Sequence, residues 1–322
     1  MRISFFGGGT DYPIWYREHG GAVISSTINK YSYITSRWLP PFFEFKHRAR
    51  YFIKEETQTI NEIRHASIRE CSKFLNIKDG LDIVHTADLP ARSGLGSSST
   101  FTVGMLHSLH TLQNHMPTKR ELAVQSIHVE QELIGESVGS QDQTAASFGG
   151  LNYIRFNSVN EIDVYPIIIS YERLNELQGN LLLVFTGFAR TASEIAASQI
   201  VSTAAKAHEL RTMQSICDQA LEYLIDHKCP LDQFGKLLNE QWYIKRNMTS
   251  LVSNPAIDDI YSVGIKNGAL GGKLLGAGGG GFMLFYAPKE KHSLIQSALN
   301  KKLFVPFRFE STGSKIIYFS HD

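Results

Sequence analysis

The stretch that decides the fold is Pro90-Ala91-Arg92-Ser93-Gly94-Leu95-Gly96-Ser97-Ser98-Ser99. It lies between a strand predicted over 81–86 and a helix predicted over 97–112. Glycines let a backbone turn tightly and bring its N–H groups close to an anion, and a helix start adds a partial positive charge. Serine hydroxyls suit phosphate oxygens or magnesium, which prefers oxygen ligands. The stretch therefore predicts a phosphate-binding loop over 93–99, with a flexible Gly/Ser loop as the alternative.

Two familiar phosphate-binding motifs do not describe this loop. A Walker A loop needs a lysine after its last glycine, and Ser97 follows Gly96 here. A dinucleotide fingerprint needs a third glycine, where this chain has Ser99. The sequence therefore predicts a nucleotide-phosphate site of another kind.

Two further glycine-rich segments lie in the chain, one near its start and one in its last quarter. The first, Gly7-Gly8-Gly9-Thr10-Asp11-Tyr12, combines a carboxylate, a hydroxyl and an aromatic ring, which suits a sugar; a turn capped by Asp11 is the alternative. The last, Gly276-Ala277-Gly278-Gly279-Gly280-Gly281, matches GxGxxG, but a strand is predicted after it where a dinucleotide fold has a helix. It predicts a place where a ligand or another backbone comes close, or a bare turn.

Two carboxylates complete the chemistry that phosphoryl transfer requires. The reaction needs metal ligands, positive charge, and a carboxylate that orients or deprotonates the attacking hydroxyl. Glu130 is expected to complete a magnesium site with Ser98, and Asp142 to face the hydroxyl. Taken alone, each residue is more simply interpreted as an ordinary surface acid, and the loop is what favours the catalytic interpretation.

Composition limits the class of protein. The 322 residues suit two domains, and the 32 basic and 31 acidic residues argue against a broad nucleic-acid surface. The three cysteines are widely spaced, which indicates a reducing compartment and no disulfide framework. No apolar run is long enough to cross a bilayer. We expect a cytoplasmic protein with no membrane or nucleic-acid partner.

Predicted strands and helices are partly segregated, which favours an α+β fold. Strands are expected near 1–6, 151–156, 164–169, 181–186, 282–287, 304–309 and 315–319. Capping-box spacing of Thr118 and Glu121 predicts a helix to about residue 136. We expect domains over 1–170 and 171–322.

Three of these segments resemble the motifs of the GHMP kinases, in the same order: 90–99, Gln141-Asp142-Gln143 and 273–281. The opening segment 2–12 is similar to the galactokinase-type sugar motif, whose Glu-His dipeptide is here Gly8-Gly9. That replacement, with Trp242, Lys245, Arg246 and the segment from Lys273, most resembles the branch that acts on D-glycero-D-manno-heptose 7-phosphate.

The resemblance implies a ribosomal-S5-like N-terminal domain and a ferredoxin-like C-terminal domain with the active site between them. It implies that 93–99 wrap the phosphates of ATP and that Ser98 and Glu130 hold Mg²⁺. Asp142 would be the base or the orienting acceptor for the sugar hydroxyl, and Arg2 would steady both Asp142 and the phosphoryl group in transfer. Substrate contacts would come from Gly9, Thr10, Asp11, Gly278 and Gly279, with residues 276–281 closing over the site.

The same resemblance implies phosphorylation of the anomeric C1 hydroxyl, giving a heptose 1,7-bisphosphate for nucleotide-activated heptose and a bacterial surface glycan. Family members usually carry several residues, including a proline, before the arginine that is Arg2 here. We therefore expect either a start upstream of Met1 or a loosely held Arg2.

A phosphorylated substrate needs a second positively charged site. Arg48 and Arg50, in a cluster with Lys46 and His47, and separately Arg190, are the candidates because guanidinium groups match phosphate oxygens. A solvated basic face is the alternative for the cluster.

Three functions remain open at this point: a heptose-phosphate kinase, a kinase of an unphosphorylated sugar such as galactose or fucose, and a non-catalytic sensor of sugar and nucleotide. The sensor is disfavoured because it has no need of Ser98, Glu130 and Asp142 together. The expected partners are ATP and a sugar phosphate, and formation of a homodimer is an open expectation.

Overall fold

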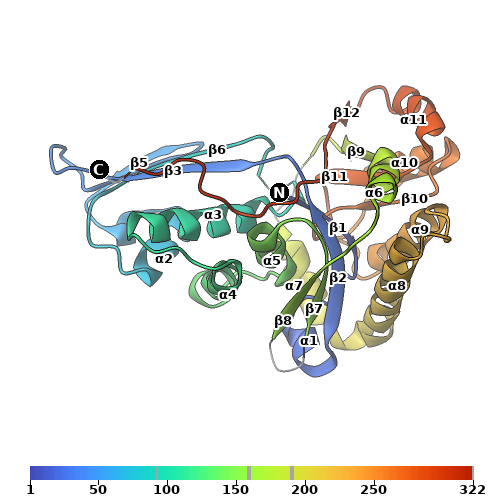
Figure 1. Cartoon of the computed structure of the whole chain (residues 1–322), viewed down its shortest axis with the longest axis horizontal. Coiled ribbons are helices and arrows are strands. Elements are labelled where there is room, and N and C mark those ends of the chain that lie inside the picture. The colour runs from blue at the N-terminus through green and yellow to red at the C-terminus, as the bar shows by residue number, and fades with distance from the viewer. Residues whose placement is uncertain (92, 158–160, 189–191, 321–322) are drawn as a thin grey trace.

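A computed structural model describes residues 1–91, 93–157, 161–188 and 192–320 (Figure 1). Within these residues the strands form three four-stranded sheets. The first sheet is antiparallel and has the order β1-β2-β7-β8. Its strands are β1 (Arg2–Phe6), β2 (Gly21–Thr27), β7 (Leu151–Phe156) and β8 (Ile162–Pro166).

The second sheet, with the order β3-β6-β4-β5, carries helices on one face. Leu81 and Ile83 point toward these helices and are buried with Leu106 and Leu109 in one core. The strands are β3 (Ser32–Trp38), β6 (Leu81–Ala87), β4 (His47–Arg50) and β5 (Lys54–Thr57). The neighbouring helices are η1 (Ile60–Glu62), α2 (Ala66–Phe74), α3 (Ser97–Leu112), α4 (Lys119–His128), the π-helical turn η2 (Val129–Ile134) and α5 (Gln141–Phe148).

The third sheet, β10-β11-β9-β12, lies at the other end of the molecule (Figure 1). Its strands are β10 (Gly271–Leu274), β11 (Phe282–Tyr286), β9 (Leu181–Phe185) and β12 (Leu303–Phe304). The helices of this half are α6 (Tyr171–Gly179), α7 (Ala192–Ser202), η3 (Ala204–Lys206), α8 (Ala207–Ile225), α9 (Asp232–Arg246), α10 (Pro255–Lys266), η4 (Lys289–Lys291) and α11 (His292–Ala298).

One apolar core joins the two halves of the chain. Phe5 and Phe6 of β1 pack edge-to-face on Phe234 of α9, and α8 packs on β2. The short helix α1 (Pro13–His19) leads from β1 to β2. Strands β1 and β2 are therefore buried between the two ends of the molecule, and the loops of the first sheet are brought beside residues from both.

The α+β fold is confirmed, as is the helix expected over 97–112. The capping box forms, with Thr118 accepting from the Glu121 amide and Glu121 accepting from the Thr118 amide. The helix expected to reach residue 136 instead ends as α4 at His128 and continues as the π-helical turn. The strand expected over 315–319 is wrong: these residues form no strand.

The last described residues return to the first half. Phe309 bridges to Ile28, and the Ser314 hydroxyl bonds to His107 at 2.9 Å. The proposed boundary near residue 170 falls between β8 and β9, and it remains a prediction. Among the described residues, no helix combines the length and apolar character needed to cross a bilayer.

Candidate active site

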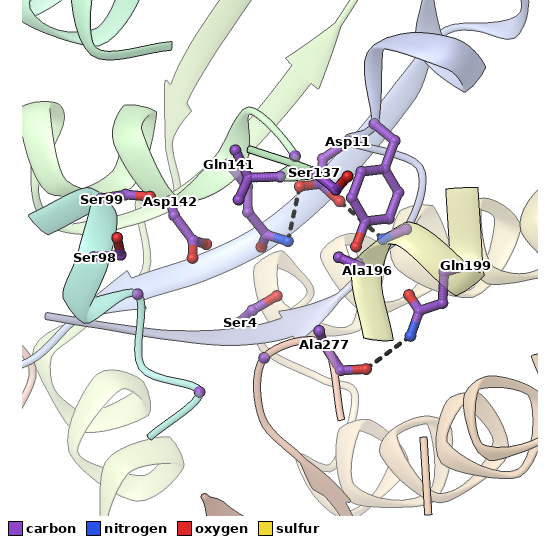
Figure 2. A pocket seen from close by; sticks show the side chains of 18 of the residues that line it. Ser4, Asp11, Ser98, Ser99, Ser137, Gln141, Asp142, Ala196, Gln199 and Ala277 are labelled. Atoms are coloured by element: carbon purple, nitrogen blue, oxygen red, sulfur yellow. Dashed lines mark hydrogen bonds between the residues drawn. The ribbon is translucent and has the colours of Figure 1, made fainter. Parts of the chain in front are cut away.

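A cavity of about 230 Å³ lies where the loops after β1 and before α3 meet α5, α9 and the last glycine-rich segment. Figure 2 shows one end of it formed by Ser98, Ser99 and Asp142, and the other by Asp11, Ala196 and Gln199. The cavity thus joins the predicted phosphate loop to the predicted sugar segment.

The loop before α3 presents its backbone to this cavity. Gly94, Gly96, Ser97, Ser98 and Ser99 line it. Gly96 is the N-cap residue of α3 with φ +70°, and it offers no side chain to cap the helix. The start of α3 therefore lies at the cavity with no side-chain cap from Gly96, as at the anion-binding helix starts of other folds.

Ser93 and Leu95 hold the loop in place from behind. Both side chains are fully buried, and neither lines the cavity. Their carbonyls accept from the backbone amides of Phe282 and Arg2, at 3.2 and 3.0 Å. Ser93 and Leu95, which were predicted to bind the cofactor, therefore stabilise the conformation of the loop and do not face the cavity.

Arg2 and Asp142 form a bidentate ion pair at the cavity wall. Nε of Arg2 donates to Oδ1 of Asp142 at 2.6 Å, and Nη2 donates to Oδ2 at 2.7 Å. Nη1 donates to the carbonyl of Gly94 at 2.8 Å. The Arg2 side chain is 4% exposed and that of Asp142 is 24% exposed. Arg2 fixes the carboxylate while leaving part of it open to the cavity.

The expectation that Arg2 is loosely held is wrong. Three of its side-chain nitrogens are engaged, and its backbone amide bonds to Leu95. Packing around β1 secures the side chain, because the neighbouring residues Met1 and Ile3 are buried in the core.

Glu130 lies next to the loop but does not line the cavity, because it contacts the lining residue Ser99 from behind. It is 1% exposed, and its Oε2 accepts from Ser99 Oγ at 2.7 Å and from Gln143 Nε2 at 2.5 Å. Within the described residues its Oε1 has no partner. Burial raises the pKa of Glu130 to about 7. The hydroxyl that contacts Glu130 is thus Ser99, whereas Ser98 is exposed and lines the cavity.

The far end of the cavity is polar and buried. Asp11 Oδ1 accepts from the Gly9 amide at 2.8 Å, and its Oδ2 accepts from Gln141 Nε2 at 3.1 Å. Burial raises the pKa of Asp11. Gly9, Asp11, Tyr12 and Gln141 all line the cavity. This end can both accept and donate hydrogen bonds, as sugar hydroxyls require.

Thr10 does not face the cavity. Its hydroxyl donates to the carbonyls of Gly7 and Ala22 at 2.8 and 3.1 Å and accepts from the Ala22 amide. The side chain is fully buried. Thr10 closes the turn between β1 and β2, and the expected sugar contact is wrong.

The last glycine-rich segment meets protein backbone. A Cβ on Gly276 would lie 2.6 Å from Gly94 Cα, and one on Gly281 would lie 2.3 Å from the Ser93 carbonyl oxygen. Gly276 and Ala277 line the cavity, whereas Gly278 and Gly279 do not. Gly279 bonds through its amide to Val252 at 2.9 Å. The glycines are needed because two loops touch, so the expected substrate contacts of Gly278 and Gly279 are corrected.

Arg48 and Arg50 lie away from the cavity, on β4 of the second sheet. Both pair with Asp82 of β6, Arg48 at 2.6 Å and Arg50 at 3.2 Å. Arg37 of β3 pairs with the same carboxylate at 2.9 Å. The strand register places these groups side by side, so the predicted phosphate pocket is wrong for Arg48 and Arg50. Arg190 lies outside the described residues.

Several side chains that line the cavity have no site role predicted from the sequence, among them Lys245, Gln199 and Gln141, and Lys245 is named there only for the family resemblance. Lys245 of α9 and Gln199 of α7 come from helices of the second half, and Gln141 precedes Asp142. Gln199 donates to the Ala277 carbonyl at 2.7 Å (Figure 2). Gln141 lay inside a quoted motif, and its place beside Asp142 was a usable signal. For the other two, helical periodicity gives no sign of which face meets a distant loop.

Comparison with family models gives the class of protein. Residues 59–150 match the GHMP kinases N terminal domain, and residues 227–304 match the GHMP kinases C terminal domain. These domains, meeting at a cavity with a phosphate loop and a carboxylate, define an ATP-dependent sugar kinase. The chain belongs to the GHMP kinase family.

Individual relatives agree with this assignment over nearly the whole chain. The chain is similar to a D-glycero-alpha-D-manno-heptose 7-phosphate kinase from Campylobacter jejuni, with 29% identity over 98% of this chain and 96% of that protein. A solved D-glycero-D-manno-heptose 1-phosphate kinase from Bacteroides thetaiotaomicron shares the fold, with a TM-score of 0.80, 22% identity and coverage of 99% and 98%. A Lactococcus lactis galactokinase with galactose also shares it, with a TM-score of 0.77, 17% identity and coverage of 98% and 92%.

Proposed function

We propose that this kinase transfers the γ-phosphoryl group of ATP to the anomeric C1 hydroxyl of D-glycero-D-manno-heptose 7-phosphate, giving the 1,7-bisphosphate. One observation carries the proposal: the α3 loop, the Arg2–Asp142 pair and the Asp11–Gln141 pair line a single cavity. The relative from Campylobacter jejuni, which bears that substrate in its name, supports the choice of sugar.

The nucleotide phosphates would bind at the start of α3. Gly94 and residues 96–99 line the cavity there, and the helix start supplies partial positive charge. Ser93 and Leu95 would act through the loop conformation that their buried side chains hold.

Magnesium fits the side chains at this end. Glu130 has a buried carboxylate oxygen with no partner among the described residues, and the Ser99 hydroxyl donates to its other oxygen. Oxygen donors of this kind are what Mg²⁺ prefers. We therefore propose that Glu130, with Ser98 or Ser99, would hold the ion. Bound magnesium would neutralise negative charge on the phosphates.

Asp142 would take the proton of the acceptor hydroxyl. As that proton passes to the open carboxylate oxygen, the sugar oxygen forms a bond to the γ-phosphorus. The bond from the γ-phosphorus to the β–γ bridging oxygen breaks, and ADP leaves. Arg2 orients the carboxylate through two hydrogen bonds and would place positive charge beside the group in transfer.

The sugar would lie toward Asp11. Asp11 and Gln141 offer an acceptor and a donor, and the Tyr12 ring lines the same end. The product would supply nucleotide-activated heptose for a bacterial surface glycan. Because the reaction consumes ATP, we place it in the cytoplasm.

A second candidate is a kinase of an unphosphorylated sugar. It is favoured by one observation: in the described part of the chain, the lysine and arginine side chains that line the cavity are Arg2 and Lys245. Arg48 and Arg50, which would have bound a substrate phosphate, face Asp82 instead.

A substrate panel tests these alternatives. The purified protein is given ATP, Mg²⁺ and either heptose 7-phosphate, a hexose phosphate or a free hexose, and ADP release is followed. We expect the highest kcat/KM with heptose 7-phosphate and a new anomeric phosphate signal by ³¹P NMR. Turnover of free galactose or fucose that equals or exceeds it would overturn the heptose proposal in favour of the second candidate.

A further inference from the structure

Lys245 occupies an unusual position for a lysine. It lies in the last turn of α9 and is 5% exposed, yet it lines the cavity. Its Nζ donates to the carbonyl of Gly276 at 2.5 Å. An ammonium group carries three donors. In the described residues this is its one hydrogen bond to protein, so the cavity is where its other donors find partners.

A second buried lysine shows the contrast. Lys273 of β10 is 1% exposed and does not line the cavity. Its Nζ donates to the carbonyls of Ser4 and Phe5, both at 2.8 Å. Lys273 joins β10 to β1 and has a structural role, whereas Lys245 is less completely satisfied and faces open space.

Charged groups of both signs lie near Lys245, and Glu136 also lines the cavity. Arg2 on β1 and Lys273 on β10 are positive neighbours, and Asp11 and Asp142 are the negative ones. Asp142 is already paired with Arg2. Burial, followed by Arg2, lowers the pKa of Lys245 to about 8. An anion in the cavity would relieve both the desolvation and the repulsion.

The position of Lys245 indicates which anion this is. Arg2 donates to the Gly94 carbonyl and Lys245 to the Gly276 carbonyl. Gly94 and Gly276 touch, since a Cβ on Gly276 would lie 2.6 Å from Gly94 Cα. Both cations are therefore held where the phosphate loop meets the glycine-rich segment. Arg2 is paired with Asp142 there, and Lys245 lies within the influence of both Asp11 and Asp142.

We propose that Lys245 binds the phosphoryl group that is being transferred, as a second cation beside Arg2 and across from the start of α3. It would thus be a catalytic residue contributed by the second half of the chain. The hydrogen bond to Gly276 would fix its amine and, with it, the contact between the two loops. This inference rests on the proposed kinase function and does not depend on the identity of the sugar.

Nucleotide binding tests the inference without any sugar. Isothermal titration calorimetry in the presence of Mg²⁺ measures the affinities for ADP and for AMPPNP, which carries an additional γ-phosphoryl group. The proteins compared are the wild type, Lys245→Met and Lys236→Met. Lys236 is an exposed lysine on the same helix and is the matched control. We expect Lys245→Met to lose about 10-fold or more of the preference for AMPPNP over ADP, with ADP affinity changed less than about twofold. Lys236→Met should behave as the wild type.

A measurement on the wild type covers the case in which Lys245→Met fails to fold. Lysines are acetylated with acetic anhydride at about pH 8, where the free amine of Lys245 is present, and rates are read by mass spectrometry. AMPPNP with Mg²⁺ should slow acetylation of Lys245 by about fivefold or more, and ADP by less than about twofold. Lys236 should be unaffected by either nucleotide.

Each outcome supports or overturns the assignment. Equal loss of ADP and AMPPNP affinity, or equal protection by both nucleotides, would overturn it and leave Lys245 a structural residue. Unchanged nucleotide affinity together with weaker binding of the sugar phosphate would also overturn it and assign Lys245 to the binding site of the acceptor sugar. If the protein phosphorylates no sugar but its preference for AMPPNP over ADP depends on Lys245, the proposed acceptor would be refuted and the proposed role of Lys245 would stand.

Discussion

Replacing Asp142 with asparagine separates catalysis from stability at the centre of the site. The carboxylate accepts two hydrogen bonds from Arg2, at 2.6 and 2.7 Å. An amide keeps one acceptor and turns a donor toward the other guanidinium nitrogen. Arg2 is 4% exposed in its side chain, so water replaces the lost partner poorly.

The loss in the free energy of unfolding caused by Asp142→Asn follows from these contacts. Removing one partner of a buried ion pair costs about 3–5 kcal/mol, and a hydrogen bond to a charged group contributes about 1.5–3 kcal/mol. The Asp142 side chain is 24% exposed and one acceptor remains, so we expect a loss of about 2–3 kcal/mol. Such a loss lowers Tm by about 5 °C in a chain of this size. Loss of the proton acceptor should lower kcat by about 1,000-fold.

The assay pairs ADP release with thermal and urea unfolding, and Asp82→Asn is the matched control. Asp82 also accepts from arginines and is 2% exposed, but it lies away from the cavity. We expect Asp82→Asn to destabilise the protein while leaving the kcat of the folded fraction within about twofold. A folded Asp142→Asn protein with kcat within about fivefold of the wild type would refute the role of Asp142. A double-mutant cycle with Arg2→Met should give a coupling of about 1–3 kcal/mol.

Three further changes test other parts of the site. Burial raises the pKa of Glu130 to about 7, above the value of about 4.3 expected in the unfolded chain. The wild type should therefore lose stability, on the order of 3 kcal/mol, as pH rises from about 4.5 to 7; Glu130→Gln should remove this slope in urea unfolding without Mg²⁺, and an unchanged slope would contradict the assignment. The pair Arg48→Met and Arg50→Met should leave the KM for the sugar phosphate and for ATP within about twofold, whereas a selective rise in the acceptor KM would restore the phosphate pocket. Gly94→Ala places a Cβ 2.5 Å from the Leu275 carbonyl oxygen at φ +81°, whereas its control, Gly135→Ala, has a similar φ of +76° and nothing within 4 Å. Urea unfolding should show Gly94→Ala to be less stable than Gly135→Ala by about 1 kcal/mol or more. Equal stabilities would show that the loop contact is unimportant.

Local pattern was enough to predict the elements that make the phosphate site. Strand β6, the loop after it and helix α3 follow from apolar periodicity and from glycines that begin a helix. The capping box at Thr118 was likewise a local signal and formed. The strand expected over 315–319 failed, because β-propensity there is not matched by a neighbouring strand to pair with.

The sequence by itself determined the chemistry of the two ends of the cavity: a hydroxyl-rich helix start and a segment with Asp11. Only the tertiary structure decided which side chains meet. Arg2 and Asp142 are 140 residues apart, and Lys245 reaches the same cavity from another helix. The register of β4 against β6 turned Arg48 toward Asp82. Local patterns specify backbone conformation, whereas contacts between distant residues depend on how complete elements pack, so residue type alone could not assign these partners.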